Sequence, residues 1–353
     1  MKNQSQGFRT RKKNEHLKLP HQRQFLFLGT SRGHHIVIYW RKSLRSDEMD
    51  FLYLLESIRI PVLNEFMLII TRLGEETAFL VAALIVFWCV DKHKGYFVMT
   101  VGFIGTMANQ FLKLACRVPR PWVLDENFSI LEQAKEAASG YSFPSGHSQS
   151  AVGTFGSIAS FTNKRCLKYT CIAICVLVPF SRMYIGVHTP ADILVGAGMA
   201  CVLVWLLRKP MLEKSDASMK YLVPLMIVLS IGLLLYTECF PFPEEIDAHN
   251  LQSGTKNAYT MIGCMIGVAV VYVAERKYVN FSTDAVWWAQ ILKAILGLGV
   301  VLLVKEGLRF PLEWILGSPL VARAVRYFLI VLVAGFLWPM TFRWFSTLGD
   351  KKA

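Results

Sequence analysis

The chain has 353 residues, of which 54% are hydrophobic, and its mean hydropathy is +0.39. Soluble domains are less apolar than this, so the composition favours an integral membrane protein. The formal net charge is +13, but 11 of the 38 Lys and Arg residues lie in the first 48 positions, and most others occupy short links between apolar runs. Because this pattern encodes membrane topology, we expect no nucleic-acid partner.

The N-terminal part of the chain is expected to lie outside the membrane core. Residues 1–48 are polar and basic, their apolar pieces are too short to cross a bilayer, and no signal-peptide core follows the basic start. We expect a disordered cytoplasmic tail, or sequence that precedes a true start at Met49. Residues 51–72 are apolar but are interrupted by charges and a proline, which indicates a helix at the membrane interface.

Nine apolar segments follow that are long enough, or nearly long enough, to span a bilayer. Their approximate ranges are 76–91, 95–115, 147–163, 166–186, 190–208, 219–237, 257–275, 287–305 and 324–342. The sequence therefore predicts an all-α, polytopic transmembrane bundle of about nine spans, preceded by the interfacial helix.

The links between these spans carry unequal numbers of basic residues. One alternating set contains 14 Lys and Arg residues, and the opposite set contains 8. The more basic set comprises 91–95, 164–168, 208–220, 275–285 and 343–353. Links rich in Lys and Arg are retained in the cytoplasm, so we expect the C-terminus inside and the opposite links outside. A basic tail fits this orientation poorly, because nine spans place the residues before the first span outside.

Three polar stretches fall in the links that are expected to lie outside. They are KLACRVPRP (Lys113–Pro121), FPSGHS (Phe143–Ser148) and SRMYIGVHTPAD (Ser181–Asp192). By contrast, the eight cysteines form no CxxC pair and no Cys/His cluster with zinc spacing, so most are interpreted as buried small hydrophobes.

The basic residues of these stretches are suited to binding an anion that has several oxygens. Arg120 and Arg182 offer guanidinium forks that match pairs of phosphate oxygens, and Lys113 acts as a point charge. Ser145 and Gly146 precede a helix, whose first N–H groups would point at the same anion, and a glycine permits close approach of the backbone.

The two histidines have complementary chemistry. A histidine with a carboxylate partner, here His188 and Asp192, can be a nucleophile or a base, because the carboxylate fixes the tautomer and stabilises the imidazolium. His147 can donate a proton to a leaving oxygen. This set of residues is the equipment for phosphoryl transfer through a histidine without a metal.

Each feature alone also has a purely structural explanation. Thr189 to Asp192 reads as a helix start, with Asp192 as a capping residue. Lys113 and Arg120 alone would be interfacial anchors, and His188 alone an interfacial histidine. These explanations do not account for the occurrence of three polar stretches with the same basic character on the same expected side of the membrane.

Together the stretches resemble the three-part signature of the type 2 phosphatidic acid phosphatase superfamily, which reads K-x(6)-R-P, P-S-G-H and S-R-x(5)-H-x(3)-D. Every fixed position is present, and the resemblance covers about residues 95–208. These positions are Lys113, Arg120, Pro121, Pro144, Ser145, Gly146, His147, Ser181, Arg182, His188 and Asp192. We assign the catalytic core to residues 49–208, and a four-span accessory region to residues 209–353.

The resemblance implies a role for each residue and no metal or other cofactor. His188 would attack phosphorus and form a phosphohistidine, Asp192 would hold and polarise it, and His147 would protonate the departing alkoxide and later activate water. The equatorial oxygens would be held by Lys113, Arg120, Ser145, Gly146 and Arg182.

A second, looser resemblance is to glucose-6-phosphatase, and it rests on nine spans with an extracytoplasmic site and on RPWVLD after the first motif. Lys293, within the predicted span 287–305, is either functional or paired with a polar neighbour inside the bundle.

The function expected from the sequence is metal-independent hydrolysis of a lipid phosphate or lipid diphosphate at the extracytoplasmic face of the cell membrane. The expected partners are the lipid substrate and membrane lipids. One alternative is a phosphatase of a soluble ester such as a sugar phosphate. The other is a non-catalytic membrane scaffold or lipid carrier, against which the two histidines of the signature argue.

Overall fold

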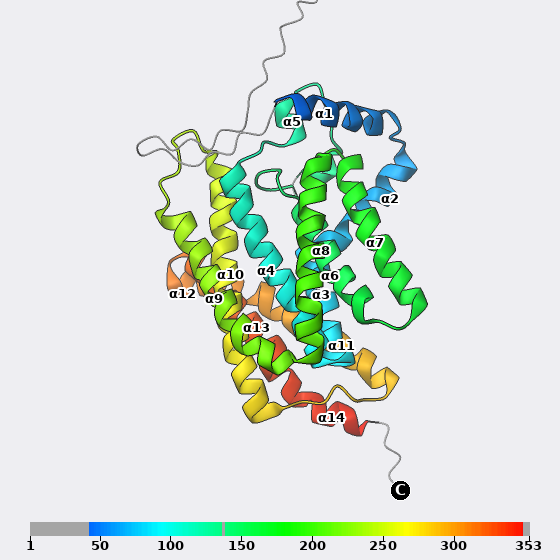
Figure 1. Cartoon of the computed structure of the whole chain (residues 1–353). Helices are drawn as coiled ribbons and strands as arrows, with labels where there is room; N and C mark the ends of the chain where they lie inside the picture. Colours follow the sequence, from blue (N-terminus) through cyan, green and yellow to red (C-terminus); the bar gives the residue numbers. More distant parts are fainter. Residues whose placement is uncertain (1–41, 136–137, 349–353) are drawn as a thin grey trace, which may run out of the picture.

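The structure, a computed structural model, describes residues 42–135 and 138–348, and all regular elements in these ranges are helical (Figure 1). The all-α prediction is thus confirmed. The α-helices are α1 (Lys42–Ser57), α2 (Pro61–Thr71), α3 (Glu76–Ile85), α4 (Lys92–Cys116), α5 (Pro121–Leu124), α6 (Gly146–Phe161), α7 (Arg165–Tyr184), α8 (Pro190–Glu213), α9 (Ser215–Cys239), α10 (Ala248–Ala274), α11 (Trp287–Gly307), α12 (Arg309–Leu316), α13 (Pro319–Leu332) and α14 (Phe342–Thr347). Short 3-10 or π segments are Arg72–Gly74, Val86–Val90, Glu132–Ala134, Glu275–Val279, Val333–Leu337 and Pro339–Thr341.

The number of membrane spans differs from the prediction. Six helices of the described residues are long and apolar enough to cross a membrane, or up to seven if the bent pair 61–74 and 76–90 forms one span. The predicted count of nine is therefore not confirmed. Helices α4 and α6 occupy predicted positions without qualifying, because α6 has only 16 residues and α4 carries the polar side chains of the site, including Asn109 and Lys113.

The segment predicted as one interfacial helix, 51–72, consists of α1 and α2. The chain is extended at Ile60, with φ −130° and ψ 151°, because the residue before a proline is driven away from the helical region. Helix α1 begins at Lys42, inside the predicted tail, and the rest of that tail lies outside the described residues. Figure 1 shows α1 lying across one end of the bundle, whereas α2 enters the bundle and packs against α7.

Helix α4 joins the two halves of the bundle. It packs against α6 and α8 on one side and against α9 and α10 on the other. Within the second half, α10 and α13 approach so closely that a Cβ on Gly263 would lie 2.1 Å from the Ala324 carbonyl oxygen. The accessory helices thus pack directly on the predicted core, and the boundary placed at residue 208 falls inside α8.

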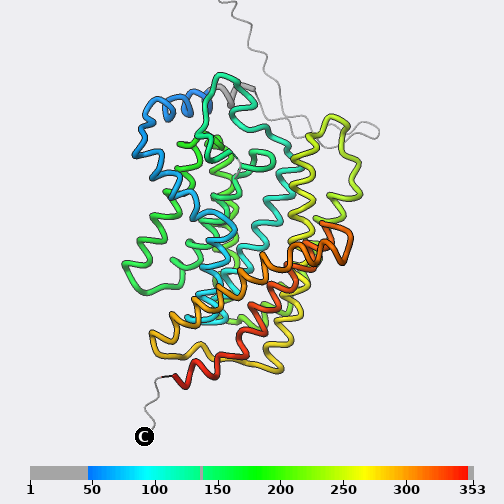
Figure 2. The backbone as a smooth tube through the Cα atoms, turned by 180° about the vertical axis from the view of Figure 1, so that it is seen from behind, coloured from blue at the N-terminus to red at the C-terminus, as the bar shows by residue number. Residues whose placement is uncertain are grey.

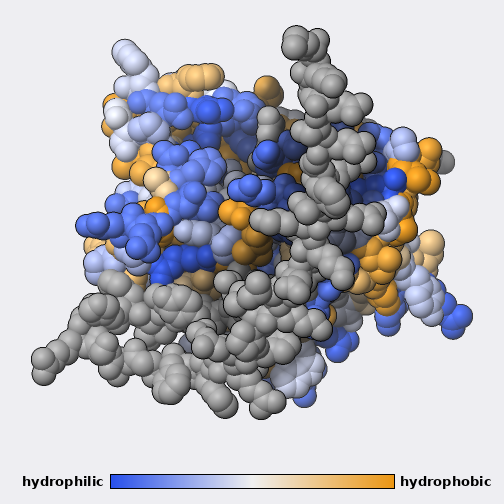
Figure 3. Space-filling model, turned by 90° about the horizontal axis from the view of Figure 1, so that it is seen from above, coloured by the Kyte–Doolittle hydropathy of each residue, from blue (hydrophilic) through white to orange (hydrophobic). Residues whose placement is uncertain are grey.

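The outer surface has the polarity of a membrane protein. Large apolar side chains are exposed around the bundle, including Trp205, Tyr221 and Leu303, which are at least 74% exposed. Seen from the end that carries α1, the described surface is largely hydrophilic (Figure 3). An apolar girdle with a polar end is what a bilayer requires, and the chain is an integral membrane protein.

The links gather at opposite ends of the bundle. The view from behind shows the loops that precede α6 and α8 near one end, and α14 at the other end (Figure 2). The links before α4 and α9 also lie at the α14 end (Figure 1). The alternation of links assumed for the charge count therefore agrees with the arrangement of these helices.

Candidate active site

The three signature stretches meet at the ends of five helices. Lys113 lies in the last turn of α4, which ends where Arg117 adopts a left-handed conformation (φ 51°) two residues before Pro119. Arg120 immediately precedes α5, and Arg182 lies in the last turn of α7. His147 is in the first turn of α6 and His188 in the loop before α8.

These residues surround one cavity of about 320 Å³. It is lined by six of the eight predicted site residues, namely Lys113, Arg120, Gly146, His147, Arg182 and His188. The other two, Ser145 and Asp192, are fully or almost fully buried behind this lining. Lining residues separated by up to 75 positions in the chain thus lie around one cavity.

The carboxylate of Asp192 lies next to the Nδ1 atom of His188. Its Oδ2 lies 3.3 Å from His188 Nδ1 and also accepts hydrogen bonds from the Thr189 N–H (2.9 Å) and the Ser142 hydroxyl (2.5 Å). Thr189 and Asp192 form a capping box at the start of α8. The capping interpretation and the histidine-partner interpretation of Asp192 therefore both hold, and they involve the same oxygen.

The other ring nitrogen of His188 faces the cations. Arg120 Nη1 lies 2.9 Å from His188 Nε2, and since a guanidinium only donates, Nε2 is the acceptor. The proton is then assigned to Nδ1, which can donate to Asp192. This tautomer leaves Nε2 unprotonated, as a nucleophile requires, while Arg120 Nη1 lies within hydrogen-bond distance of it.

Arg120 is fixed by backbone carbonyls. Its guanidinium donates to the carbonyl oxygens of Val187 (3.0 Å), Gly140 (3.0 Å) and Ser139 (2.9 Å). Burial lowers the pKa of Arg120 to about 10, so the side chain remains charged near neutral pH. A buried cation with fixed geometry is already organised for an anion.

The environment also keeps His188 neutral. Burial, followed by the positive charges of Arg120, Arg182 and Lys113, lowers the pKa of His188 well below its usual value. The same cations that would attract a phosphate therefore favour the unprotonated imidazole, and an arriving anion would offset their charge.

Lys113 and Arg182 complete the cationic lining. Lys113 Nζ donates to the Tyr141 carbonyl oxygen. Arg182 is 1% exposed, its Nη1 donates to Thr71 Oγ1 at 2.9 Å, and its Nε is buried without a partner among the described residues. A buried guanidinium with an unused donor is suited to a further acceptor in the cavity.

The start of α6 contributes backbone donors and the second histidine. Ser145 is the N-cap, and its hydroxyl accepts hydrogen bonds from the N–H and the hydroxyl of Ser148, at 3.4 and 2.9 Å. The hydroxyl is thus engaged within the helix start, and its contact with a phosphate stays a prediction. Gly146 and His147 line the cavity, and they lie in the first turn of α6, where the N–H groups have no intrahelical acceptor. His147 Nε2 is buried and has no partner among the described residues.

Several supporting residues were not found from the sequence. Ser142 holds Asp192, and Asn109 Nδ2 donates to the Pro144 carbonyl oxygen (3.2 Å), one turn before Lys113 on α4. The i, i+4 spacing of two polar residues in an apolar helix was an available signal for Asn109. Gly196 lets α8 approach the α6 start, since a Cβ there would lie 2.5 Å from the Ser145 carbonyl oxygen.

Lys293 lies elsewhere in the bundle. It is 1% exposed, donates to the Thr283 carbonyl oxygen (3.3 Å) and lies 4.4 Å from the centroid of the Phe342 ring. It does not line the active-site cavity. These contacts favour the second interpretation of this residue, a charge satisfied inside the bundle. No group of three or more His, Cys, Asp or Glu residues with metal-site geometry occurs within the described part of the chain.

The chain belongs to the PAP2 superfamily, the group of type 2 phosphatidic acid phosphatases that the signature resembled. The family's model matches residues 93–215, and a second model, "PAP2 superfamily phosphatase, transmembrane extension", matches residues 259–351. Membership makes the chain a phosphoric ester hydrolase.

Its relatives include two proteins of Bacillus subtilis (strain 168). Phosphatidylglycerophosphatase B is 31% identical over 164 residues, which are 43% of this chain and 76% of the relative. Undecaprenyl-diphosphatase BcrC is 30% identical over 115 residues, which are 33% of this chain and 56% of the relative. A solved transmembrane PAP2-type phosphatidylglycerolphosphate phosphatase from Bacillus subtilis has 28% sequence identity and a TM-score of 0.41, covering 48% of this chain and 86% of that one.

Proposed function

We propose that the protein hydrolyses the phosphate or diphosphate of a membrane lipid through a phosphohistidine on His188, without a metal, at the extracytoplasmic face of the cell membrane. The main support is the cavity itself. Its cationic end holds the signature residues, and the rest of its lining mixes apolar side chains such as Phe103 and Ile330 with polar ones, including Glu76 and Lys305. A lipid phosphate likewise combines a charged headgroup with apolar chains. The named relatives act on phosphatidylglycerophosphate and on undecaprenyl diphosphate.

The proposed reaction has two steps. His188 Nε2 attacks phosphorus as the bond to the lipid oxygen breaks, and protonated His147 donates its proton to that oxygen. His147 then removes a proton from water, which attacks the phosphohistidine and releases inorganic phosphate. Asp192 stabilises the imidazolium, while Lys113, Arg120, Arg182, Ser145 and the Gly146 N–H hold the equatorial oxygens. The cations perform the charge stabilisation that a metal performs in other phosphatases, so no metal is required.

The proposed sidedness rests on charge. If α3, α4 and α6 cross the membrane with the six qualifying helices, the spans number nine and the basic links share one side. The 14 basic residues on that side against 8 on the other favour a cytoplasmic C-terminus. The site would then face away from the cytoplasm, at the level of lipid headgroups.

A substrate panel tests the proposal. Purified protein is assayed for phosphate release from phosphatidic acid, phosphatidylglycerol phosphate, a sphingoid-base phosphate, a polyprenyl diphosphate and glucose 6-phosphate, with His188→Ala as the blank. The highest kcat/KM is expected for one of the lipids. A preference for the sugar phosphate would establish the soluble-ester alternative. Release from none of them, by protein that is folded in the membrane, would favour the scaffold or carrier.

A further inference from the structure

The active-site cavity is not built by the signature region alone. Its far wall comes from α10, α11 and α13, which belong to the accessory region. The residues that these helices contribute are Asn257, Thr260, Met261, Cys264, Lys305, Tyr327, Ile330 and Val331. All except Asn257 lie within the segment that matches the transmembrane extension, 259–351. The extension is therefore positioned to contact whatever occupies the site.

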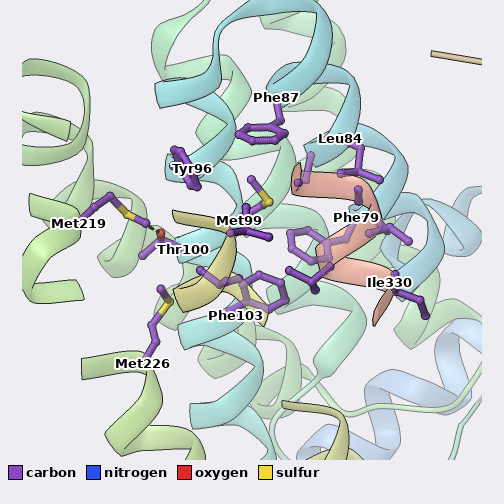
Figure 4. Close-up of a pocket in the computed structure, with 17 residues that line it drawn as sticks. Phe79, Leu84, Phe87, Tyr96, Met99, Thr100, Phe103, Met219, Met226 and Ile330 are labelled. Carbon is purple, nitrogen blue, oxygen red and sulfur yellow. Dashed lines mark hydrogen bonds between the residues drawn. The ribbon is translucent and has the colours of Figure 1, made fainter. Parts of the chain in front are cut away.

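A second, apolar chamber of about 60 Å³ adjoins the cavity and is lined by residues of α3, α4, α9, α10 and α13 (Figure 4). The two spaces share five lining residues, Phe79, Leu80, Phe103, Ile330 and Val331. The rings of Phe79 and Phe103 meet edge to face, with their centroids 5.8 Å apart. These two rings and α13 thus form the boundary between the cationic site and the chamber.

The chemistry of the chamber limits what it can hold. Its other walls include Leu84, Met99 and Met226, and the Thr100 hydroxyl is turned to the sulfur of Met219 at 3.9 Å. Phosphate or glycerol oxygens would be left without partners there, which is costly, whereas hydrocarbon loses nothing. Methionine side chains also adapt to ligands of variable shape. The volume of about 60 Å³ is several times the roughly 10–15 Å³ that a single water-sized probe needs, so the chamber has room for a short piece of chain.

We propose that this chamber receives the hydrocarbon chain of the substrate next to its phosphate, and that Ile330 of the extension limits how much chain can enter. The inference rests on the proposed function, since it assumes that a phosphate ester is bound by the cationic end. The proposal gives the extension a role in selecting the hydrocarbon part of the substrate, while the signature region carries out the reaction.

A series of n-alkyl phosphates from methyl to octyl tests this assignment, because these esters remain monomeric in water at low concentration. Each methylene that leaves water for the chamber should raise kcat/KM by about fourfold, the equivalent of about 0.8 kcal/mol, until the chamber is full. The wild-type protein, reconstituted in nanodiscs, should therefore show a rise with chain length followed by a plateau.

Two opposite substitutions should move the plateau. Ile330→Trp fills the chamber and should bring the plateau at least one carbon earlier, whereas Ile330→Ala enlarges it and should delay the plateau. Val321→Trp is the matched control, because Val321 lies on the same helix and is 42% exposed. If the tryptophan variant does not fold, the alanine variant alone decides.

The outcomes separate the two proposals. No hydrolysis of any alkyl or lipid phosphate by wild-type protein would overturn the proposed function. Hydrolysis without dependence on chain length, or a plateau that stays in place in Ile330→Ala, would overturn the chamber while leaving the phosphatase intact. A plateau that moves equally in Val321→Trp would also contradict the assignment to Ile330.

Discussion

Removal of the Ser142 hydroxyl should slow turnover without preventing folding. In Ser142→Ala, Asp192 Oδ2 loses the 2.5 Å hydrogen bond but keeps the Thr189 N–H at 2.9 Å. A hydrogen bond to a charged group contributes about 1.5–3 kcal/mol, and because the carboxylate keeps the Thr189 N–H and the His188 Nδ1–H as donors, we take the lower figure. If that energy serves to orient His188 in the transition state, kcat should fall by roughly tenfold.

The assay is steady-state hydrolysis of an aryl phosphate by purified protein. KM should change little, because Ser142 does not line the cavity. Ser142→Thr restores a hydroxyl and should recover most of the activity, a rescue that a merely structural role would not produce. Ser157→Ala, which removes another fully buried hydroxyl farther along α6, is the control and should stay near wild type. An unchanged kcat in Ser142→Ala would refute the idea that this residue positions the carboxylate.

Four further outcomes are expected. His188→Ala should abolish turnover, and wild-type turnover in this variant would refute the mechanism. His147→Ala should reduce turnover most for esters with poor leaving groups and less for an activated aryl phosphate. Activity should survive EDTA, and vanadate should inhibit by adopting the trigonal-bipyramidal geometry; loss on chelation with recovery on adding magnesium would indicate another chemistry. Because the pKa of His188 is lowered, its neutral form persists as pH falls, and the midpoint of the acid-side decrease in kcat/KM should lie below about pH 6.5. This midpoint should not move when substituents on the ring of an aryl phosphate change the pKa of the substrate. Single cysteines are introduced at Ser139, which is exposed near the site, and at Asn163, which is exposed in a basic link, in a background without native cysteines. An impermeant maleimide added to intact cells should label the cysteine at position 139 and spare the one at position 163. The reverse pattern would place the site in the cytoplasm.

The convergence of the candidate site residues could be predicted because they are polar side chains at or next to the ends of apolar helices. Such residues are expensive in a membrane unless they meet one another, and Lys113, Arg182 and His188 do so around one cavity. The approximate positions of the helices could be predicted from hydropathy, because polar residues are costly inside the membrane and therefore gather between the apolar runs. The break at Ile60 could also have been read from Pro61, but the apolar run on both sides suggested a single helix.

The far wall of the cavity could not be predicted in the same way. Met261, Ile330 and Val331 look like any other apolar residues of a span, and hydropathy does not distinguish a side chain facing lipid from one facing a cavity. The predicted span count is not confirmed for a related reason. Helix α4 is central to the bundle, packed on both sides, so it tolerates polar residues that lower its hydropathy below that of the outer helices.

Asp192 shows why a structural and a catalytic interpretation of one residue need not compete. The capping box requires the carboxylate to reach back to the Thr189 N–H, which fixes the position of Oδ2 at the start of α8. His188 precedes Thr189 directly, so the same geometry brings its Nδ1 within 3.3 Å of that oxygen. The proposed nucleophile is thereby oriented by the start of a helix that packs against α4 and α6, which carry Lys113 and His147. Orientation of the imidazole is therefore coupled to the start of α8, because the carboxylate oxygen that holds Nδ1 is also the one that caps this helix.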